Sequence, residues 1–545
     1  MKTNTEVVIL GGGLAGLSLA RQLKLTMPDI DIVVLEKNSF PLSEAAVKVG
    51  ESTVEMGAHY YANILKMKKH LEKEQFFKLG LRYFFPYNNN EDITQRFEMG
   101  SAQLPTPVPT YQIDRGRFEN ALYDINKING ITILENCKVQ NVILSENKQS
   151  QHDIIYFDGQ NQKTIQATWV VDATGRFGFL RKKLSLHVPV KHDSCAAWFR
   201  IQTVIDVTEW SDDPQWLARA PLGQRYMSTN HLMGTGYWVW LIPLASGSTS
   251  IGVVYDPKIH DNSNFKDFEG TLIWLNKHEP QCAKHIDKHR DKLQDFRFLK
   301  QYAHSCTELY SNNRWFLTGE AGVFADPFYS PGSDFIALGN TYITDLIKRD
   351  RNQECIASRI VCYNKTLLTY FDLLLSHFEG HYQNFDCAYL MVQKILWDTI
   401  CAFAIPYLLF FTQKFCDLNF MQQTGLPALM RYQTLTYQVQ AYFKKNNAVY
   451  KKIKLEKAFL NFSDIIHSNY FNGSIYRQLQ RYYKYNNAAL KIEIEKNIFL
   501  IEKIAHDILT NKAIIPLFFL ENEGNDSELW KITKSQLTLA VQNGW

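Results

Sequence analysis

Up to about residue 345, the chain alternates short apolar runs rich in β-branched residues with longer stretches of helical period. The runs occupy residues 7–10, 31–35, 131–135, 153–157 and 168–174. Short β-branched runs predict strands, whereas apolar residues three and four positions apart predict helices. The alternation of the two predicts an α/β architecture.

Two further patterns divide the chain. Apolar and aromatic runs at residues 196–204, 237–244 and 249–256 predict an antiparallel sheet, inserted over about residues 185–310 as one wall of a substrate cavity. After about residue 345 helical periods rich in Tyr, Phe, Lys and Asn take over. We therefore expect an α/β part over residues 1–345 and a helical region over 346–545 that packs on it.

The most apolar stretch, residues 395–411, contains Asp398 and Pro406. It falls short of the roughly 20 uninterrupted apolar residues that a membrane-spanning helix needs. A buried helix is favoured, and peripheral contact with lipid or with an acyl substrate is the alternative. No basic and apolar leader precedes the first predicted strand, so we expect no secretion.

The composition argues against several other classes of protein. Hydrophobic residues make up 46% of the chain and charged residues 21%, which is typical of a packed globular protein. A net charge of +4 over 545 residues gives no case for nucleic-acid binding. The nine cysteines form no C-x-x-C pair, so we expect neither a metal site nor disulfides, and a cytoplasmic location.

A nucleotide-binding motif follows the first predicted strand. Gly11, Gly13 and Gly16 form G-x-G-x-x-G at the start of a predicted helix, where backbone N–H groups can bind a pyrophosphate. Glu36 ends the next strand, about 20 residues further on, where a carboxylate can bind a ribose. The strand, the helix and the acid together predict a Rossmann-type fold.

Three later segments resemble motifs of FAD-dependent aromatic monooxygenases. They are residues 112–115 (QIDR), 172–175 (DATG) and 319–322 (GEAG). The resemblance implies that Arg115 lies near the flavin, that Asp172 and Gly175 close over the adenine side, and that Gly319 and Glu320 hold the ribityl chain and phosphates. Glu320 stands where that family has aspartate. No second strand–glycine–helix unit occurs in the sequence, so no built-in NAD(P)H site is evident.

Within this superfamily the chain resembles the flavin-dependent halogenases. Residues 238–243 (WVWLIP) match W-x-W-x-I-P, residues 324–332 (FADPFYSPG) match F-x-x-P-x-x-S-x-G, and residues 50–53 (GEST) match a segment near the flavin that includes Ser52. The resemblance covers about residues 1–350. It implies that Trp238 and Trp240 line the substrate cavity, although two alternating tryptophans are by composition ordinary sheet core.

The same resemblance identifies catalytic residues. Lys78 falls where the family has its essential lysine, and Ser330 is the serine of the second pattern. By itself such a lysine is usually solvated, but its neighbours Phe76, Phe77 and Leu79 favour a partly desolvated amine. Lys48, two residues before Gly50, is the rival. In the family this amine guides hypohalous acid, made from reduced FAD, O2 and halide, to an aromatic carbon.

Two departures from the halogenase pattern bear on substrate and halide. Tyr329, expected to line the substrate cavity, occupies the position where tryptophan halogenases have a glutamate, which favours a phenol-like or pyrrole-like ring over free tryptophan. Pro331 has no N–H to offer a halide, so halide binding is expected at Gly332 and Ser333.

The resemblance also implies partners. A separate NAD(P)H-dependent flavin reductase is expected, with a substrate that is free, bound to a carrier protein or lipid-like. The alternatives are an aromatic hydroxylase, a reductase of the geranylgeranyl type and a flavoprotein scaffold without activity. Oxygen consumption without halide would favour the hydroxylase, and alkene reduction without oxygen the reductase.

Overall fold

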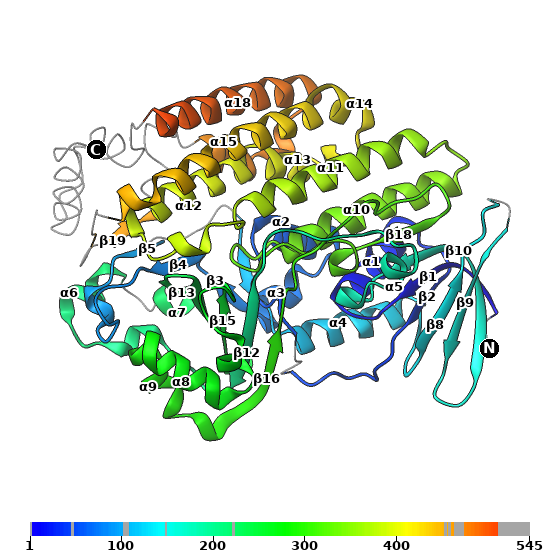
Figure 1. Cartoon of the computed structure of the whole chain (residues 1–545). Coiled ribbons are helices and arrows are strands. Elements are labelled where there is room, and N and C mark those ends of the chain that lie inside the picture. The colour runs from blue at the N-terminus through cyan, green and yellow to red at the C-terminus, as the bar shows by residue number, and fades with distance from the viewer. Residues whose placement is uncertain are drawn as a thin grey trace.

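The strands expected in the first part of the chain form a seven-stranded sheet in the computed structural model (Figure 1). The structure describes residues 3–44, 48–101, 108–147, 150–220, 224–451, 455, 459–462 and 474–510. The strand order is β7 (Thr132–Leu134), β2 (Ile32–Leu35), β1 (Asn4–Leu10), β10 (Gln162–Asp172), β9 (His152–Phe157) and β8 (Lys138–Ile143), with β18 (Trp315–Leu317) beside β10. Strands β7, β2, β1, β10 and β18 are parallel, whereas β9 and β8 are antiparallel. The predicted α/β fold is confirmed.

Helices cover the parallel part of this sheet. Helix α1 (Leu14–Thr26) contacts both α4 (Arg115–Ile128) and α10 (Gly332–Arg351). Every residue of β2 is buried. Burial on both faces explains why the parallel strands are continuous apolar runs rather than alternating ones.

A second sheet of eight strands lies beside the first. Its order is β16 (Leu293–Leu299), β12 (Cys195–Ile201), β15 (Thr249–Tyr255), β14 (Tyr237–Pro243), β13 (Thr229–Gly234), β4 (Leu81–Phe84), β5 (Glu98–Gly100) and β19 (Phe459–Asn461). Strands β12, β15 and β14 are antiparallel neighbours, as expected. Strands β4, β5 and β19 come from outside residues 185–310, so this sheet draws on more of the chain than the predicted insertion.

The two faces of this sheet have different neighbours. Val239 and Leu241 of β14 pack in a core with α8 (Phe268–His278) and α9 (Pro280–Asp287). Trp238 and Trp240, which alternate with them, pack in the main core of the molecule. The period of two in β14 therefore separates an outer core from the side that carries the tryptophans.

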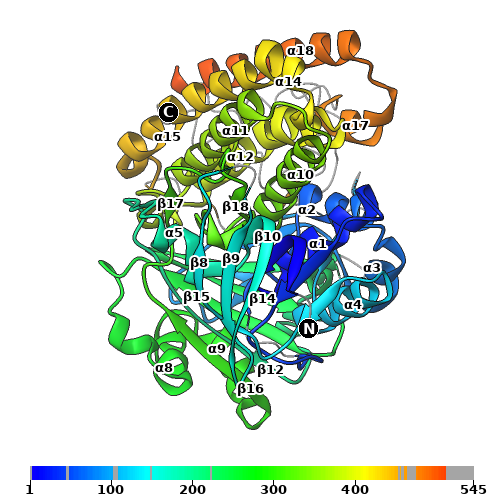
Figure 2. The same ribbon diagram turned by 90° about the vertical axis from the view of Figure 1, so that its right-hand side faces the viewer.

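Helices dominate the chain after β18, as predicted. They lie as a layer over the two sheets in both views (Figures 1 and 2). The longest are α10, α11 (Ala357–Ser376), α12 (Ala388–Ala402), α15 (Leu426–Tyr450) and α18 (Asn487–Leu509). Helix α10 crosses residue 345, so the predicted division at 345 falls within a helix. Residues 511–545, expected to be helical, lie outside the described residues.

The apolar stretch at residues 395–411 lies in a continuous helical segment, Ala388–Phe411. It consists of α12, the π-helix η9 (Phe403–Tyr407) and α13 (Leu408–Phe411). The segment is long and apolar enough to cross a membrane, but 89% of its most apolar window is buried inside the protein. Burial of this kind is typical of a core helix in a soluble protein.

Shorter elements connect these layers. The short helices are α2 (Glu55–His59), η1 (Tyr60–Ile64), α3 (Lys68–Glu74), η2 (Ile93–Gln95), η3 (Gly175–Phe177), α5 (Phe179–Lys183), η4 (Val207–Trp210), α6 (Pro214–Arg219), α7 (Gln224–Met227), η5 (Asn262–Phe265), η6 (Arg290–Lys292), η7 (Gly319–Ala321), η8 (Tyr382–Asn384), η10 (Lys414–Cys416), α14 (Leu418–Phe420), η11 (Met421–Gly425), α17 (Ser474–Gln480) and η12 (Tyr482–Lys484). Two small sheets pair β3 (Phe76–Lys78) with β6 (Thr110–Gln112) and β11 (His187–Val188) with β17 (Ser305–Cys306). All nine cysteines are free thiols.

Candidate functional site

The three motif glycines lie in the turn between β1 and α1. A Cβ at Gly11, where φ is +105°, would lie 2.6 Å from the Ala173 carbonyl oxygen, and one at Gly16 would lie 2.0 Å from the Gly11 oxygen. A Cβ at Gly13 would meet nothing within 4 Å. Gly13 is also the N-cap of α1 and caps it with no side chain. The open space in front of the uncapped N–H groups fits the pyrophosphate of FAD.

The two predicted nucleotide-side acids have structural partners in the protein. Glu36 Oε2 accepts the Gly12 N–H at 2.7 Å, and Oε1 accepts the Asn38 N–H at 2.9 Å. Asp172 accepts the Thr174 N–H at 2.9 Å and the Leu180 N–H at 2.7 Å, which fixes the turn that leads to Gly175. Both acids thus shape the loops around the nucleotide end, and their contacts with ribose or adenine stay a prediction.

A cavity extends from the glycine turn to the tryptophan strand. It holds about 880 Å³ of empty space, including the part open to solvent, and begins at Leu14. Its walls bring together most of the remaining sequence-predicted residues: Gly50, Ser52, Arg115, Trp238, Trp240, Gly319, Glu320, Ser330, Gly332 and Ser333. Segments from six separate parts of the chain therefore converge on one space.

Arg115 and Glu320 face this cavity with partners of their own. The guanidinium of Arg115 donates to the carbonyl of Val49 and, at 2.6 Å, to Glu119 Oε1. Glu320 is half-buried and lies 3.8 Å from the Arg176 Nε. Arg115 therefore holds the segment that leads into the Gly50 turn, and the Glu320 carboxylate keeps one side open to the cavity.

Lys78 is buried at the end of β3, with 1% of its surface exposed. Its Nζ donates to the Ser52 Oγ at 2.8 Å and to the Thr53 carbonyl at 2.7 Å. Burial lowers the pKa of Lys78 to about 7, against the opposing influence of Glu55 and Asp334. A neutral amine has two N–H groups, both of which these contacts use, so its lone pair is left for an electrophile.

Lys48, the rival lysine, has a different environment. Its side chain is 32% exposed and forms an ion pair with Glu119. The Lys48 side chain is held by a carboxylate of α4 at a partly exposed position and is not among the described residues that line the cavity. The geometry therefore favours Lys78 over Lys48.

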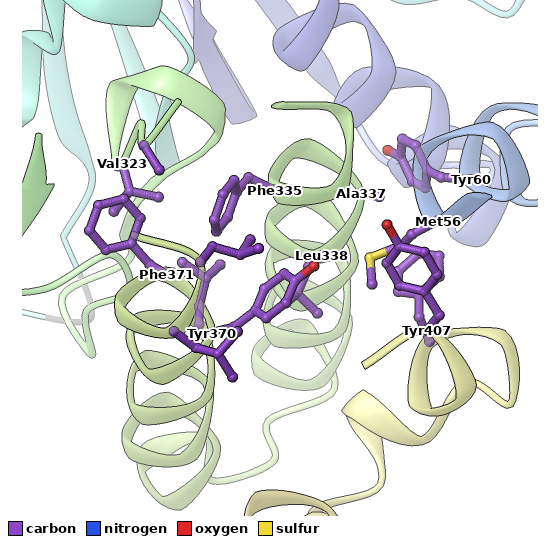
Figure 3. Close-up of a cluster of buried hydrophobic side chains, with 14 of the residues drawn as sticks. Met56, Tyr60, Val323, Phe335, Ala337, Leu338, Tyr370, Phe371 and Tyr407 are labelled. Carbon is purple, nitrogen blue, oxygen red and sulfur yellow. The ribbon is translucent and has the colours of Figure 1, made fainter. Parts of the chain in front are cut away.

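A buried carboxyl group lies on the far side of the Lys78 segment. Asp334 in α10 accepts the Gly57 N–H at 2.9 Å and the Tyr407 hydroxyl at 3.0 Å. Burial raises the pKa of Asp334 to about 8. Figure 3 shows Tyr407 beside Met56, with α10 opposite. Helices α2 and α10 and the π-helix η9 thus meet behind the amine.

The two signature tryptophans are anchored by their indole N–H groups. Trp238 Nε1 donates to the Tyr382 hydroxyl at 3.1 Å, and Tyr382 donates to Asp326 at 2.7 Å. Trp240 Nε1 donates to the Ser250 Oγ at 3.2 Å. Their ring centroids lie 5.7 Å apart along the cavity wall. The polar edge of each indole is satisfied within the protein, which leaves an apolar wall toward the cavity.

Tyr329 does not join the sequence-predicted residues in the cavity. Among the described residues that line it, Tyr329 is absent, and its hydroxyl donates to Asp398 of α12 at 2.8 Å. The Tyr329 side chain therefore extends toward the helical region and not into the cavity, where it was expected. The predicted direct role of Tyr329 in the cavity is therefore not what the geometry supports.

Its neighbours Ser330 and Gly332 do line the cavity. Ser330 has a φ of +58°, which is rare for a residue with a side chain. Its N–H donates to the Pro327 carbonyl at 2.9 Å. Helix α10 begins at Gly332, where a Cβ would meet nothing within 4 Å. The first N–H groups of α10 lie beside the cavity, in the position expected for halide binding.

Sequence reasoning missed Thr229 and His231 of β13, both of which line the cavity. The hydroxyls of Thr229 and Ser52 are hydrogen-bonded at 3.1 Å. His231 Nδ1 lies 3.1 Å from the Arg82 carbonyl, and burial lowers the pKa of His231 to about 3, so the imidazole is neutral. Neither residue belongs to a motif, and the pairing of β13 with β14 and β4 brings them to the site.

Comparison with known proteins agrees with this geometry. The family model described as FAD binding domain matches residues 4–328. The chain belongs to the FAD-binding-domain family. The prediction of FAD as its cofactor is confirmed. Among the described residues of this flavoprotein, no group of three or more His, Cys, Asp and Glu side chains could hold a metal ion.

Relatives of this flavoprotein are flavin-dependent halogenases, which confirms the predicted resemblance. The flavin-dependent halogenase chlA of Dictyostelium discoideum is 27% identical over 373 residues, which cover 63% of this chain and 60% of chlA. The 1H-pyrrole-2-carbonyl-[peptidyl-carrier protein] chlorinase of Pseudomonas fluorescens is 26% identical over 384 residues, or 66% of this chain and 79% of the chlorinase. The match thus spans less than two thirds of chlA.

Solved structures share the fold over a larger part of the chain. Halogenase PltM in complex with phloroglucinol and FAD has a TM-score of 0.59 at 15% identity, covering 94% of this chain and 99% of PltM. The flavin-dependent halogenase CmlS has a TM-score of 0.56 at 21% identity, covering 71% of this chain and 66% of CmlS. The likeness to PltM includes the helical region, which the sequence motifs do not reach.

Proposed function

We propose that this flavoprotein is a halogenase that uses reduced FAD, O2 and halide to halogenate an electron-rich aromatic ring. One observation carries the proposal: a buried lysine amine is hydrogen-bonded to the wall of a cavity that also contains the tryptophan pair. Reduced FAD, when bound, would activate O2, and O2 would supply the oxidising equivalents that convert halide into hypohalous acid. The halogenase relatives support the same reaction.

The residues of the chain have distinct tasks in this proposal. The glycine turn and the start of α1 bind the pyrophosphate, and Arg115, Gly319 and Glu320 border the rest of FAD. The first turn of α10, with Gly332 and Ser333, receives halide. The tryptophan wall excludes water and keeps the aromatic substrate from the flavin.

Lys78 directs the halogen. Its amine loses its proton near neutral pH because it is buried, so it can hold hypohalous acid or take its halogen. Guidance of this kind is needed because free hypohalous acid reacts indiscriminately. Ser330, held at a positive φ beside the cavity, is the second catalytic residue of the proposal.

We assign a phenol-like or pyrrole-like substrate. Such rings supply their own electron density and do not need the glutamate of tryptophan halogenases, whose position Tyr329 fills while it bonds to Asp398. Two relatives act on or bind rings of this class: the chlorinase, named for a carrier-bound pyrrole, and PltM, seen with phloroglucinol. A separate NAD(P)H-dependent flavin reductase supplies the reduced FAD.

The test is mass spectrometry of phenols, pyrroles and indoles, free and carrier-bound, after incubation with the protein, FAD, a flavin reductase, NADH and bromide or chloride. Wild type is expected to give products with a halogen isotope pattern. Lys78→Ala is expected to lose them and to keep FAD binding, whereas Lys48→Ala keeps both. Oxygenated products that do not depend on halide or on Lys78 would instead indicate a hydroxylase.

A further inference from the structure

Two hydroxyl groups connect the Lys78 amine to the wall of the cavity. Among the described residues, Ser52 and Thr229 line the cavity and Lys78 does not. Both residues are buried, with 6% of Ser52 and 2% of Thr229 exposed. Lys78 Nζ donates to Ser52 Oγ at 2.8 Å, and Ser52 Oγ lies 3.1 Å from Thr229 Oγ1. A reagent at this part of the cavity wall therefore meets the hydroxyl pair next to the amine.

The Ser52–Thr229 pair has one hydroxyl hydrogen that its own hydrogen bonds do not use. Each hydroxyl has one hydrogen, and the bond between the two oxygens uses one of the two, whichever residue donates. Ser52 Oγ accepts the amine N–H, so that bond uses no hydroxyl hydrogen. One hydroxyl hydrogen is left over, at the wall of the cavity and next to the amine.

The position of Thr229 is fixed by the sheet. Thr229 begins β13, its N–H donates to the Gly80 carbonyl at 3.1 Å, and the Leu79 N–H donates to the Met227 carbonyl at 2.8 Å. These bonds tie the start of β13 to the turn directly after Lys78. A hydroxyl on rigid strand backbone keeps its place without a further ordering cost.

We propose that the Ser52–Thr229 hydroxyl pair is a proton relay that assists the transfer of halogen from hypohalous acid in the cavity to the Lys78 amine. The inference rests on the proposed halogenase function and deepens it. It assigns to Thr229 a task that no motif of the chain indicates.

The transfer balances in atoms and charge. The amine lone pair forms a bond to the halogen as the oxygen–halogen bond breaks, and the departing oxygen takes the spare hydroxyl hydrogen and leaves as water. The hydroxyl pair regains its hydrogen from the amine N–H through Ser52. Hypohalous acid and amine thus become water and haloamine, and the halogen keeps its oxidation state, so no further oxidant is needed.

The experiment separates formation of hypohalous acid from its use. Full-length protein with FAD, flavin reductase, NADH and bromide is given either monochlorodimedone, which traps released hypohalous acid, or the best aromatic from the substrate panel. In Thr229→Val, which removes the hydroxyl and keeps the shape, aromatic bromination is expected to fall on the order of 100-fold. Bromination of the trap is expected to stay near the wild-type level.

Matched variants sharpen the result. Thr229→Ser restores the hydroxyl and is expected to recover most of the aromatic bromination. Ser52→Ala breaks the relay at its other member and is expected to behave like Thr229→Val. Thr208→Val is the control for the substitution itself, because it removes a hydroxyl in η4 that has no hydrogen-bond partner among the described residues.

The outcomes are distinct. If Thr229→Val brominates the aromatic as well as Thr208→Val does, the relay is wrong. If Thr229→Val loses FAD binding and trap bromination together, Thr229 has only a structural task and the relay is again wrong. If wild type brominates neither acceptor, the proposed function itself fails, and the relay with it.

Discussion

At the scale of single residues, Lys78 combines a structural cost with chemical use. An amine with a pKa of about 7 in the folded protein and about 10.5 when unfolded destabilises the fold at and below pH 7. As the pH rises from 7 to about 10.5, the unfolded chain holds the proton that the folded protein has lost, so stability rises. We expect Lys78→Met to be more stable than wild type at pH 7 and to unfold at a higher denaturant concentration. The free energy of unfolding should rise by about 1–3 kcal/mol, after subtraction of the two hydrogen bonds that Lys78 loses.

The pH series is the check on this expectation. The advantage of Lys78→Met should be largest at and below pH 7 and should shrink toward pH 10.5. Lys48→Met, at a half-exposed and paired lysine, should show no such gain. A Lys78→Met protein that is less stable than wild type at pH 7 would mean that the hydrogen bonds outweigh the cost of burial.

The proton on Lys78 also predicts the pH profile of the reaction. Only the neutral amine can take halogen, so aromatic halogenation should rise with pH through about 7. The titratable groups that face the amine are Glu55 of α2, Asp334 of α10 and His231 of β13. The Glu55 carboxylate raises the pKa of Lys78, so Glu55→Gln should move the rise to lower pH. A profile that Glu55→Gln leaves unmoved would show that another group limits the rate.

Single residues also mark what could be read from the sequence. The glycines, Lys78 and the tryptophans belong to motifs with fixed spacing, and the structure brings most motif residues to one cavity. Thr229 carries no such signal, because its partner Ser52 lies 177 residues away and the two meet only through sheet pairing. The hydrogen bond from Tyr329 to Asp398 could not be predicted either, because no local sequence pattern gives the position of helix α12 relative to Tyr329.

At the scale of elements, the turn between β1 and α1 separates glycines that the fold requires from one that the cofactor requires. A Cβ at Gly16 would lie 2.0 Å from the Gly11 oxygen, so Gly16→Ala should destabilise the turn and the protein. A Cβ at Gly13 meets no protein atom within 4 Å, so Gly13→Ala should fold with nearly wild-type stability without FAD but should bind FAD more weakly. Thermal unfolding with and without FAD, together with FAD titration, measures both. Equal FAD affinity in Gly13→Ala and wild type would place the pyrophosphate elsewhere.

Elements also differ in how far the sequence predicts them. Strands β1, β2 and β10 were predictable because each contains an apolar run, at residues 7–10, 32–35 and 169–171, in the buried parallel part of the sheet. Strand β19, only three residues long, was not, because it exists through its pairing with β5. A buried helix was predicted for residues 395–411, but its π-helical part η9, which contains Pro406, was not, because the sequence pattern does not distinguish a π-helix from an α-helix.

At the scale of the whole molecule, the two sequence-predicted parts share one core. The main hydrophobic cluster includes Val7 of β1, Trp238 of β14 and Ile508 of α18. Polar contacts cross the same boundary: Tyr382 binds Trp238 and Asp326, and Tyr407 binds Asp334. A helical region that completes both the tryptophan wall and the surroundings of Lys78 is part of the site rather than an attachment to it.

We therefore expect one cooperative unfolding transition. Separate domains would lose structure in separate steps, whereas a shared core couples the sheets to the helices. Helical circular dichroism, which reports mainly on α10–α18, should lose its signal at the same denaturant concentration as tryptophan fluorescence, which reports largely on the sheets. FAD, which we propose binds at the β1–α1 turn, should shift both curves equally, because a ligand of the folded state stabilises everything that unfolds with it. Two resolved transitions, or an FAD shift confined to the fluorescence curve, would show that the helical region unfolds independently, and the hydrogen bonds of Tyr382 and Tyr407 would then be too weak to couple it to the site.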